Sequence, residues 1–386
     1  MESVAQLVGL DIAGELPDRF GLMLDGWSHA SVHYVAVFVC YAVDGVAKYA
    51  LLSMAPIIQE PNDDLSARTH REYLAGVLET FGKALSDCVY LVGDNCSVNK
   101  RLDTIMQVPL VGCASHRLNL AVRHHLEQYE EDSAIVQALM VKLRTLKQSS
   151  KLRLKTPLRP VIRQDTRWGS TFAMVHRYHE LIKFMDADDD DIMELLPSPA
   201  CNRRLKTLYA ELKDIESVSK ALQANDITLL DVRVWFDGLI AAHPNFADYI
   251  GPRATIVHSP DFESGCVRVL KDSGARLTAT EKRALRPFVC SPATASDEED
   301  DAAGDSFVQR LEKRRRLEAR KPRYGLLASI PPTSNKVDRF FSVARTTFGQ
   351  ERNSLQPATL ETILFLREND RFWDVSTVDR IVSNRD

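Results

Sequence analysis

The sequence lacks the features that mark secreted, membrane-spanning or strongly basic proteins. Its seven cysteines are odd in number and widely spaced, with no CxxC pair, so we expect neither a disulfide framework nor a zinc knuckle. No run approaches the roughly 18 apolar residues that span a bilayer, and the amino terminus lacks the basic region and apolar core of a signal peptide. A net charge of -4 argues against binding a polyanion by bulk charge. We therefore expect an intracellular, soluble protein whose nucleic-acid contacts, if any, are local.

The chain does contain enough apolar residues for two or three domains, with 386 residues of which 45% are hydrophobic and 26% charged. Apolar runs predict strands at 20–27, 34–43, 46–54, 89–92 and 110–113, and Asp44-Gly45 predicts a two-residue hairpin turn. Apolar residues at helical spacing predict helices near 74–85, near 98–105 and from about 116. The order βββαβαβα indicates an α/β fold, and the simplest pairing puts the fourth strand beside the first.

Two aspartates stand directly after predicted buried strands. Asp25 follows FGLML, and Asp94 follows VYLVG. Ligands collect just beyond the carboxyl ends of parallel strands, and two like charges at close range are tolerable only with a cation between them. The pattern therefore predicts a two-metal phosphoryl-transfer site. Asp25-Gly26 and Gly93-Asp94-Asn95 are also typical of ordinary turns, and the strand order is what favours metal.

Five segments follow one another along the chain: LMLDGWS, VGDN, GCASHRLNLAV, QDTRWGSTFAMVHRY and SNKVDRFFSVARTTFGQERNSLQPATLETILFLREN. In this order they resemble the motif set of hAT-superfamily transposases. The resemblance covers nearly the whole chain and implies an RNase H-like mixed sheet, interrupted by a large all-α insertion domain and completed by C-terminal helices. The expected division is an RNase H-like first part at 1–126, a helical insertion at 127–290, an acidic then basic disordered linker at 291–323, and a C-terminal dimerisation region at 324–386.

The same resemblance implies a catalytic acidic triad. On matching positions the triad falls on Asp25, Asp94 and Asp338, which would bind two Mg²⁺ or Mn²⁺ ions. The family has a glutamate at the third position, whereas VDRFFS here holds the shorter Asp338. Because Mg²⁺ demands near-ideal octahedral geometry, the loss of one methylene leaves open whether the chain is an active enzyme or a relic.

DNA contacts are expected on three further groups of residues. Arg167 and Trp168 match a family motif in the insertion, where the tryptophan would stack on an extruded base and the arginine would meet a phosphate, although a lone tryptophan is more often a core residue. His116 would contact a phosphate, or cap its helix as a satisfied histidine. A lysine- and arginine-rich segment is either a DNA-binding stripe or a solvated helix face, and its candidate contacts are Lys151, Arg153 and Lys155.

Other segments complete the expectations. Cys113 and His116 have CxxH spacing but no second pair, so no structural zinc is expected. The acidic stretch at 186–191 is typical of a loop that ends a helix. The basic run Lys313–Arg316 is typical of a nuclear-localisation signal or of an exposed charged helix, and a DNA-related function favours the nucleus. Two apolar helix faces after Ser334 need partners, either within the chain or in a second copy.

The sequence shows no BED-type zinc finger, the element with which autonomous hAT transposases recognise DNA ends. The leading hypothesis is therefore a truncated or domesticated transposase-derived protein that binds DNA and dimerises. One alternative is an active metal-dependent nuclease or transposase. The other is a catalytically inert dimeric scaffold. We expect no association with membranes.

Overall fold

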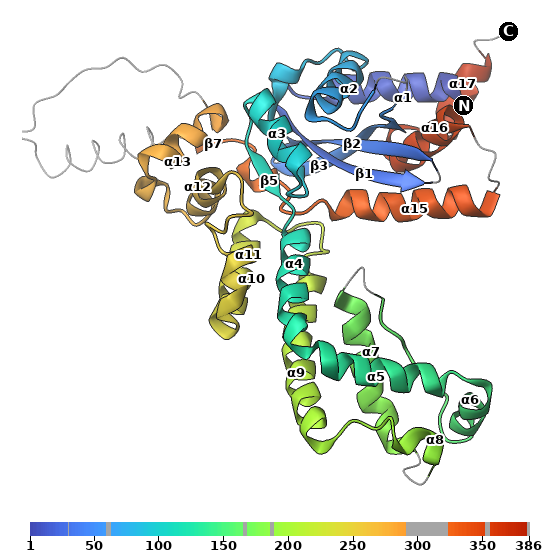
Figure 1. Cartoon of the computed structure of the whole chain (residues 1–386). Coiled ribbons are helices and arrows are strands. Elements are labelled where there is room, and N and C mark those ends of the chain that lie inside the picture. Colours follow the sequence, from blue (N-terminus) through green and yellow to red (C-terminus); the bar gives the residue numbers. More distant parts are fainter. Residues whose placement is uncertain are drawn as a thin grey trace, which may run out of the picture. The chain divides into compact units, whose positions relative to one another are not determined.

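The computed structural model describes residues 1–29, 31–58, 63–164, 168–185, 189–290, 323–351 and 356–383 (Figure 1). The chain forms two compact units. We call them the sheet unit, made of Met1–Gly112, Thr228–Asp231 and His258–Asp386, and the helical unit, made of Cys113–Ile227 and Val232–Val257. Within the described ranges, no helix combines the length and apolar character needed to cross a membrane.

The sheet unit is built on one mixed five-stranded sheet. Its strands are β1 (Phe20–His29), β2 (Val32–Val43), β3 (Val46–Pro56), β4 (Cys88–Gly93) and β5 (Leu110–Gly112), in the order β3-β2-β1-β4-β5. β1 pairs antiparallel with β2 and parallel with β4. The predicted strands, and the prediction that the fourth lies beside the first, are confirmed. The hairpin turn is confirmed as well, because Asp44 and Gly45 both have positive φ, at 52° and 77°.

Helices cover both faces of this sheet, which is why its strands are continuous apolar runs. Successive side chains of a strand point to opposite faces. Leu22 and Leu24 of β1 share a core with Val8 of the first helix, whereas Met23 of β1 belongs to a second core that contains Phe340. The helices of this unit are α1 (Glu2–Glu15), α2 (Ala67–Glu79), α3 (Ser97–Met106), α12 (Pro260–Leu270), α13 (Ala279–Ala284), α15 (Asn335–Glu351), α16 (Pro357–Glu368) and α17 (Val375–Ser383).

The helical unit has a core of its own. Leu139, Tyr178, Leu208 and Phe236, all buried, belong to one apolar cluster of this unit. Its helices are α4 (Ala114–Leu126), α5 (Glu130–Leu143), α6 (Leu146–Arg153), α7 (Trp168–Leu181), α8 (Asp190–Met193), α9 (Pro199–Ala221), α10 (Leu229–Ala242) and α11 (Ala247–Ile250). The first three residues of α10 belong to the sheet unit, and the rest of the helix, from Val232, belongs to the helical unit.

The boundaries of the two units differ from the division expected at 127 and 290. α4 begins at Ala114 and belongs with the helical unit, apart from the sheet unit, whose first segment ends at Gly112. α12 and α13 belong to the sheet unit because Phe262, Cys266 and Leu285 enter the core that also holds Met23. Most of the expected linker, 291–322, lies outside the described residues, and Arg323–Tyr324 forms the short strand β7, which pairs with β6 (Val289–Cys290).

The C-terminal segment packs on the sheet through apolar and polar contacts. Phe340, Phe341 and Leu364 are buried in the sheet unit, so the two apolar faces predicted after Ser334 find partners within the chain. Asn369, only 1% exposed, accepts a hydrogen bond from the Leu51 amide (3.1 Å) and donates one to the Leu51 carbonyl (2.9 Å). One side chain thus pairs with the backbone of the edge strand β3.

Candidate metal centre

Asp25 and Asp94 come from neighbouring parallel strands. The register of β1 and β4 pairs Met23 with Val92, and each aspartate lies two residues further on. β1 itself continues past Asp25 to His29, so Asp25 stands where the parallel pairing with β4 has ended, not at the end of its own strand. The sequence-based expectation that the two carboxylates occupy the same end of adjacent strands therefore agrees with the register.

The strands approach each other closely at this edge because residue 93 is glycine. A Cβ on Gly93 would lie 2.9 Å from the Asn99 side-chain nitrogen and 3.2 Å from the Leu24 carbonyl oxygen. Both distances are shorter than ordinary carbon contacts, so any larger residue would push the Asn99 amide or β1 away. Gly93 therefore allows Asn99 to reach the aspartate that follows.

Asp94 is held by its own loop and by the start of α3. The Asn99 side chain donates to Asp94 Oδ1 at 2.7 Å, and the Cys96 amide donates to the same oxygen at 3.3 Å. Asn99 is 7% exposed, and its backbone amide donates to the Cys96 sulfur that caps the helix. Two donors on one oxygen, together with a hydrogen bond between the Cys96 thiol and the same carboxylate, fix the orientation of Asp94.

Asp338 reaches the site on α15, which runs along β1 (Figure 1). The ring of Phe341 lies 5.9 Å from the Trp27 ring, and the ring of Phe348 lies 4.3 Å from that of His29. Asp25 and Trp27 are two residues apart on one face of the strand, and Asp338 and Phe341 are three apart on one side of the helix. The docking of the aromatic pair therefore carries Asp338 toward Asp25.

The pKa of Asp25 depends on its burial and on the two other aspartates. Burial raises the pKa of its carboxyl, the charges of Asp338 and Asp94 raise it further, and a hydrogen bond from the Gly26 amide at 2.8 Å opposes them; the resulting pKa is about 7, against an ordinary value of 3.8. A carboxylate that is disfavoured by two like charges is stabilised by a cation. The charges of the other two aspartates predicted from the sequence thus both act on Asp25 in the folded chain.

A buried amide lies next to this site. Asn95 is 8% exposed, and neither its side-chain oxygen nor its nitrogen has a hydrogen-bond partner among the described residues. It packs over Gly112 at the end of β5, where a Cβ would lie 2.2 Å from the Asn95 oxygen. Buried polar groups without partners cost free energy, and they are found where a ligand satisfies them. Carboxylate and amide oxygens are the ligands that hard divalent cations such as Mg²⁺ and Mn²⁺ prefer. In the metal-free chain, however, the described residues Asp25, Asp94 and Asp338 do not form a cluster whose ligand atoms all lie within 4.8 Å of one another.

The described residues that were expected to contact DNA belong to the helical unit. Arg167 lies outside the described residues. Trp168 is 7% exposed and belongs to the helical core, and its ring lies 6.4 Å from that of Phe172. This burial is typical of a core tryptophan. His116 is partly exposed in the first turn of α4.

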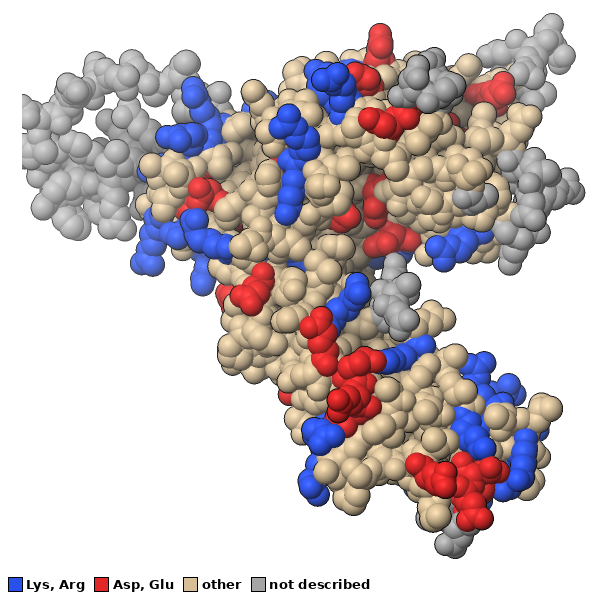
Figure 2. Space-filling model, viewed as in Figure 1, with Lys and Arg blue, Asp and Glu red and all other residues tan. Residues whose placement is uncertain are grey.

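The basic segment is paired with the acidic one. Figure 2 shows acidic and basic side chains gathered at the α6–α8 end of the helical unit. Lys142 and Lys147 form ion pairs with Asp191, at 2.9 and 3.1 Å, and Lys151 forms one with Asp189. Hydrogen bonds from Lys142 and Lys147 hold the pKa of Asp191 well below its usual range.

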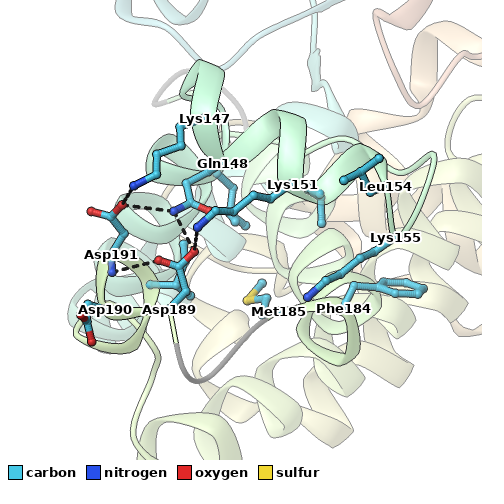
Figure 3. Close-up of a pocket in the computed structure, with 13 residues that line it drawn as sticks. Lys147, Gln148, Lys151, Leu154, Lys155, Phe184, Met185, Asp189, Asp190 and Asp191 are labelled. Carbon is cyan, nitrogen blue, oxygen red and sulfur yellow. Dashed lines mark hydrogen bonds and ion pairs between the residues drawn. The ribbon is translucent and has the colours of Figure 1, made fainter.

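These ion pairs border a pocket of about 710 Å³ between α6 and α8, which Lys155 also lines (Figure 3). Arg153, on the same helix as Lys151, is exposed. The basic segment is therefore partly neutralised by the described part of the acidic stretch, which was expected to be a loop that ends a helix. Ion pairing between segments that are distant in sequence leaves no local pattern.

Sequence reasoning missed the residues that support the aspartates. Asn99 was detectable in principle, because a polar residue shortly after a strand-end aspartate falls in the first turn of the next helix. The role of Gly112 depends on how closely β5 approaches Asn95, which only the folded chain reveals. Comparison with protein-family models and with curated proteins finds no match for this chain.

Proposed function

We propose that this chain is a hAT transposase-derived protein whose RNase H-like core holds a divalent metal ion between Asp25, Asp94 and Asp338 and carries out polynucleotidyl transfer on DNA. The observation that carries the proposal is the register of β1 and β4, which places Asp25 and Asp94 each two residues beyond the paired Met23 and Val92, while α15 brings Asp338 to β1. The charges of Asp338 and Asp94 also help to raise the pKa of Asp25, after burial. These three residues come from widely separated segments, and the resemblance implies the same three from the sequence alone. The strand order β3-β2-β1-β4-β5, with only β2 antiparallel to both of its neighbours, supports an RNase H-like topology.

Each of the three aspartates has a different role in the proposed site. Asp94 is oriented by Asn99, so its carboxylate is held in place to bind a cation. Asp25 has to lose its proton before it can do the same, because its pKa is about 7. Asp338 is brought to the site by the packing of α15 on β1. A divalent cation, when bound, supplies the positive charge that activates water and offsets the charge developing on a phosphate.

DNA binding and dimerisation are part of the proposal. Of the basic residues, Arg153 and Lys155 are exposed on or beside α6 and would meet the phosphate backbone, as would His116 on α4. The C-terminal region 324–386 would pair two copies. Its main apolar faces are already buried within the chain, so the dimer contact would use the outer surfaces of α15 to α17. The nucleus would be the site of action.

The test is a plasmid-nicking and hairpin-forming assay with the full chain and Mn²⁺ or Mg²⁺. Asp25→Asn and Asp94→Asn should each abolish metal-dependent cleavage, since removal of one carboxylate charge removes a ligand of the cation. Asp44→Asn is the matched control. It makes the same chemical change in the hairpin turn between β2 and β3, at the far end of β2 from the residue that pairs with Asp25.

Cleavage that persists in Asp25→Asn and Asp94→Asn would overturn the catalytic assignment. Metal binding in the unaltered chain without any cleavage would reduce the proposal to a DNA-binding relic. Salt-dependent DNA binding, measured alongside, should weaken in a combined Arg153→Ala and Lys155→Ala variant.

A further inference from the structure

Two histidines and a glutamate converge within the helical unit. His125 lies near the end of α4, Glu211 lies on α9, and His243 follows α10 directly. One ligand atom from each of the three lies within 4.8 Å of the other two. Nothing in the acidic site of the sheet unit involves these residues, so they call for an explanation of their own.

Aromatic rings pack against His125 in this cluster. Its side chain is 6% exposed, and its ring lies 5.3 Å from that of His243 and 5.4 Å from that of Phe246. Glu211, whose side chain is 22% exposed, accepts hydrogen bonds from His125 Nε2 at 3.0 Å and from the Tyr129 hydroxyl at 3.3 Å. Among the described residues, no lysine or arginine forms an ion pair with Glu211. The half-buried carboxylate of Glu211 therefore has two imidazoles and a phenol, and no ion-paired lysine or arginine, as its neighbours.

We propose that His125, Glu211 and His243 bind a divalent transition-metal ion of the Zn²⁺ type. Two imidazole nitrogens and one carboxylate oxygen are ligands that Zn²⁺ prefers, and three protein ligands leave a fourth position open for water. Ligand atoms of a tetrahedral zinc site are about 3.3 Å apart, given metal–ligand bonds of about 2.0 Å. His125 and Glu211, at 3.0 Å, are already close to this spacing. His243, within 4.8 Å of both, needs only a small approach, which a residue at the end of a helix can make by side-chain rotation.

Binding requires one proton to move on His125. In the structure its Nε2 donates to Glu211, and its Nδ1 lies 3.1 Å from the Gln128 side-chain nitrogen and 3.4 Å from that of Asn245. A metal on Nε2 takes the place of that proton, and the neutral ring then carries its proton on Nδ1. Nδ1–H then needs an acceptor, as ligating histidines require of their second nitrogen, so the amides of Gln128 and Asn245 would both turn their nitrogens away and one would present its oxygen. The charge of the site changes only by that of the ion.

The donor set separates this site from the carboxylate site of the sheet unit. Imidazole nitrogen favours Zn²⁺ and Co²⁺, whereas three aspartates favour Mg²⁺ and Mn²⁺. Binding at the new site would tie α4, α9 and the residue after α10 together. It would therefore stabilise the helical unit, since an ion that binds only the folded state raises its stability.

The experiment uses the full chain carrying Asp94→Asn, which weakens the carboxylate site, and Co²⁺ as a spectroscopic probe for Zn²⁺. Titration should give one bound ion with the visible absorption of a nitrogen- and oxygen-ligated Co²⁺ and no thiolate charge-transfer band, and Zn²⁺ should displace it. Glu211→Gln and His243→Gln should each weaken binding by more than about tenfold. His125→Gln is less informative alone, because His125 is buried and its replacement also disturbs the packing around it.

His176→Gln is the matched control. His176 also contacts a glutamate, Glu180 at 3.7 Å, and a tyrosine hydroxyl, that of Tyr209 at 2.8 Å, without belonging to a three-ligand cluster of the described residues. Its variant should bind Co²⁺ as the parent does. Absence of the Co²⁺ signal in the folded parent, or a signal unchanged in both Glu211→Gln and His243→Gln, would overturn the proposal and leave a hydrogen-bonded core histidine. Because Asp94 is already altered, neither outcome depends on the function proposed for the sheet unit.

Discussion

The rings of Trp27 and Phe341 lie 5.9 Å apart, each a few residues beyond an aspartate of the candidate metal centre. Phe341 is 7% exposed, so truncation to alanine should destabilise the chain by about 3 kcal/mol through lost burial and the cavity left behind. The same truncation should lower Mn²⁺ affinity, because α15 then holds Asp338 less firmly. Urea unfolding and calorimetric titration measure the two effects. A large loss of stability with unchanged metal affinity would separate the aromatic contact from the site.

The raised pKa of Asp25 predicts opposite pH dependences for stability and for metal binding. The metal-free folded chain keeps the proton up to about pH 7, whereas the unfolded chain loses it near its ordinary pKa of 3.8. This group's contribution to stability therefore falls as the pH rises from about 4 to 7 and is constant above 7. Metal binding needs the ionised form, so Mn²⁺ affinity should rise by about tenfold per pH unit below 7 and level off above it.

Asp25→Asn supplies the variant for this pH test. Without metal at pH 8, it should be more stable than the parent by on the order of 2 to 4 kcal/mol, because a half-buried charge beside two like charges has been removed. It should also abolish the pH dependence of Mn²⁺ affinity. Thermal unfolding in the presence of a chelator, from pH 5 to 8, checks the first expectation. A parent and a variant with parallel stability profiles would show that Asp25 titrates normally.

Two substitutions at Asp338, one that lengthens the side chain and one that removes its charge, test the role of the third carboxylate. Asp338→Glu restores the side chain found in the family that the sequence resembles, and it should raise Mg²⁺-dependent cleavage relative to the parent. Mn²⁺ tolerates less regular coordination, so the gain should be smaller with Mn²⁺. Asp338→Asn should abolish cleavage with either ion. Initial rates on a plasmid substrate measure the effect, and an Asp338→Glu rate below that of the parent would show that the site has adapted to the shorter residue.

Asn99 orients Asp94 without belonging to the site. Asn99→Ala removes the 2.7 Å hydrogen bond and should weaken Mn²⁺ binding by about 10- to 100-fold, the usual effect of losing a residue that orients a metal ligand. Asn99→Asp would place a fourth carboxylate beside Asp94 and should raise the pH needed for binding. Isothermal titration over a pH series distinguishes the two variants. Unchanged affinity in Asn99→Ala would assign the hydrogen bond to local folding alone.

Much of the sheet was predictable from the sequence because each strand is a short apolar run between turn residues. The order of the elements along the chain allows only a few sheet topologies. The observed parallel pairing of Met23 with Val92 belongs to the simplest of them, in which the fourth strand lies beside the first. α1 was not predicted as a helix, although Val4, Val8 and Ile12 recur at helical spacing and all three are buried. The assignment of α12 to the sheet unit was not predictable either, because the direction in which Phe262 packs depends on partners from distant parts of the sequence.

Some side chains of the candidate sites were predictable from the sequence and others were not. Asp25 and Asp94 were predictable because strand ends have a local pattern. The ion pairs of Lys147 and Lys151 were not, because opposite charges distant in sequence carry no information about their separation in space. The cluster of His125, Glu211 and His243 is a stronger case. Its members come from three separate helical segments, and their spacing along the chain matches no short metal-binding motif.

The bond between Asn369 and Leu51 also has a consequence for biosynthesis. On the ribosome, β3 is made long before residue 369, so the backbone groups of Leu51 on its outer edge have no cover until synthesis is almost complete. The same delay applies to the acidic site, which has two carboxylates until α15 emerges and adds the third. A nascent or prematurely terminated chain would therefore expose an unpaired strand edge that can associate with other chains, so it would need protection by chaperones. Because the third carboxylate would still be missing, such a chain would not cleave DNA.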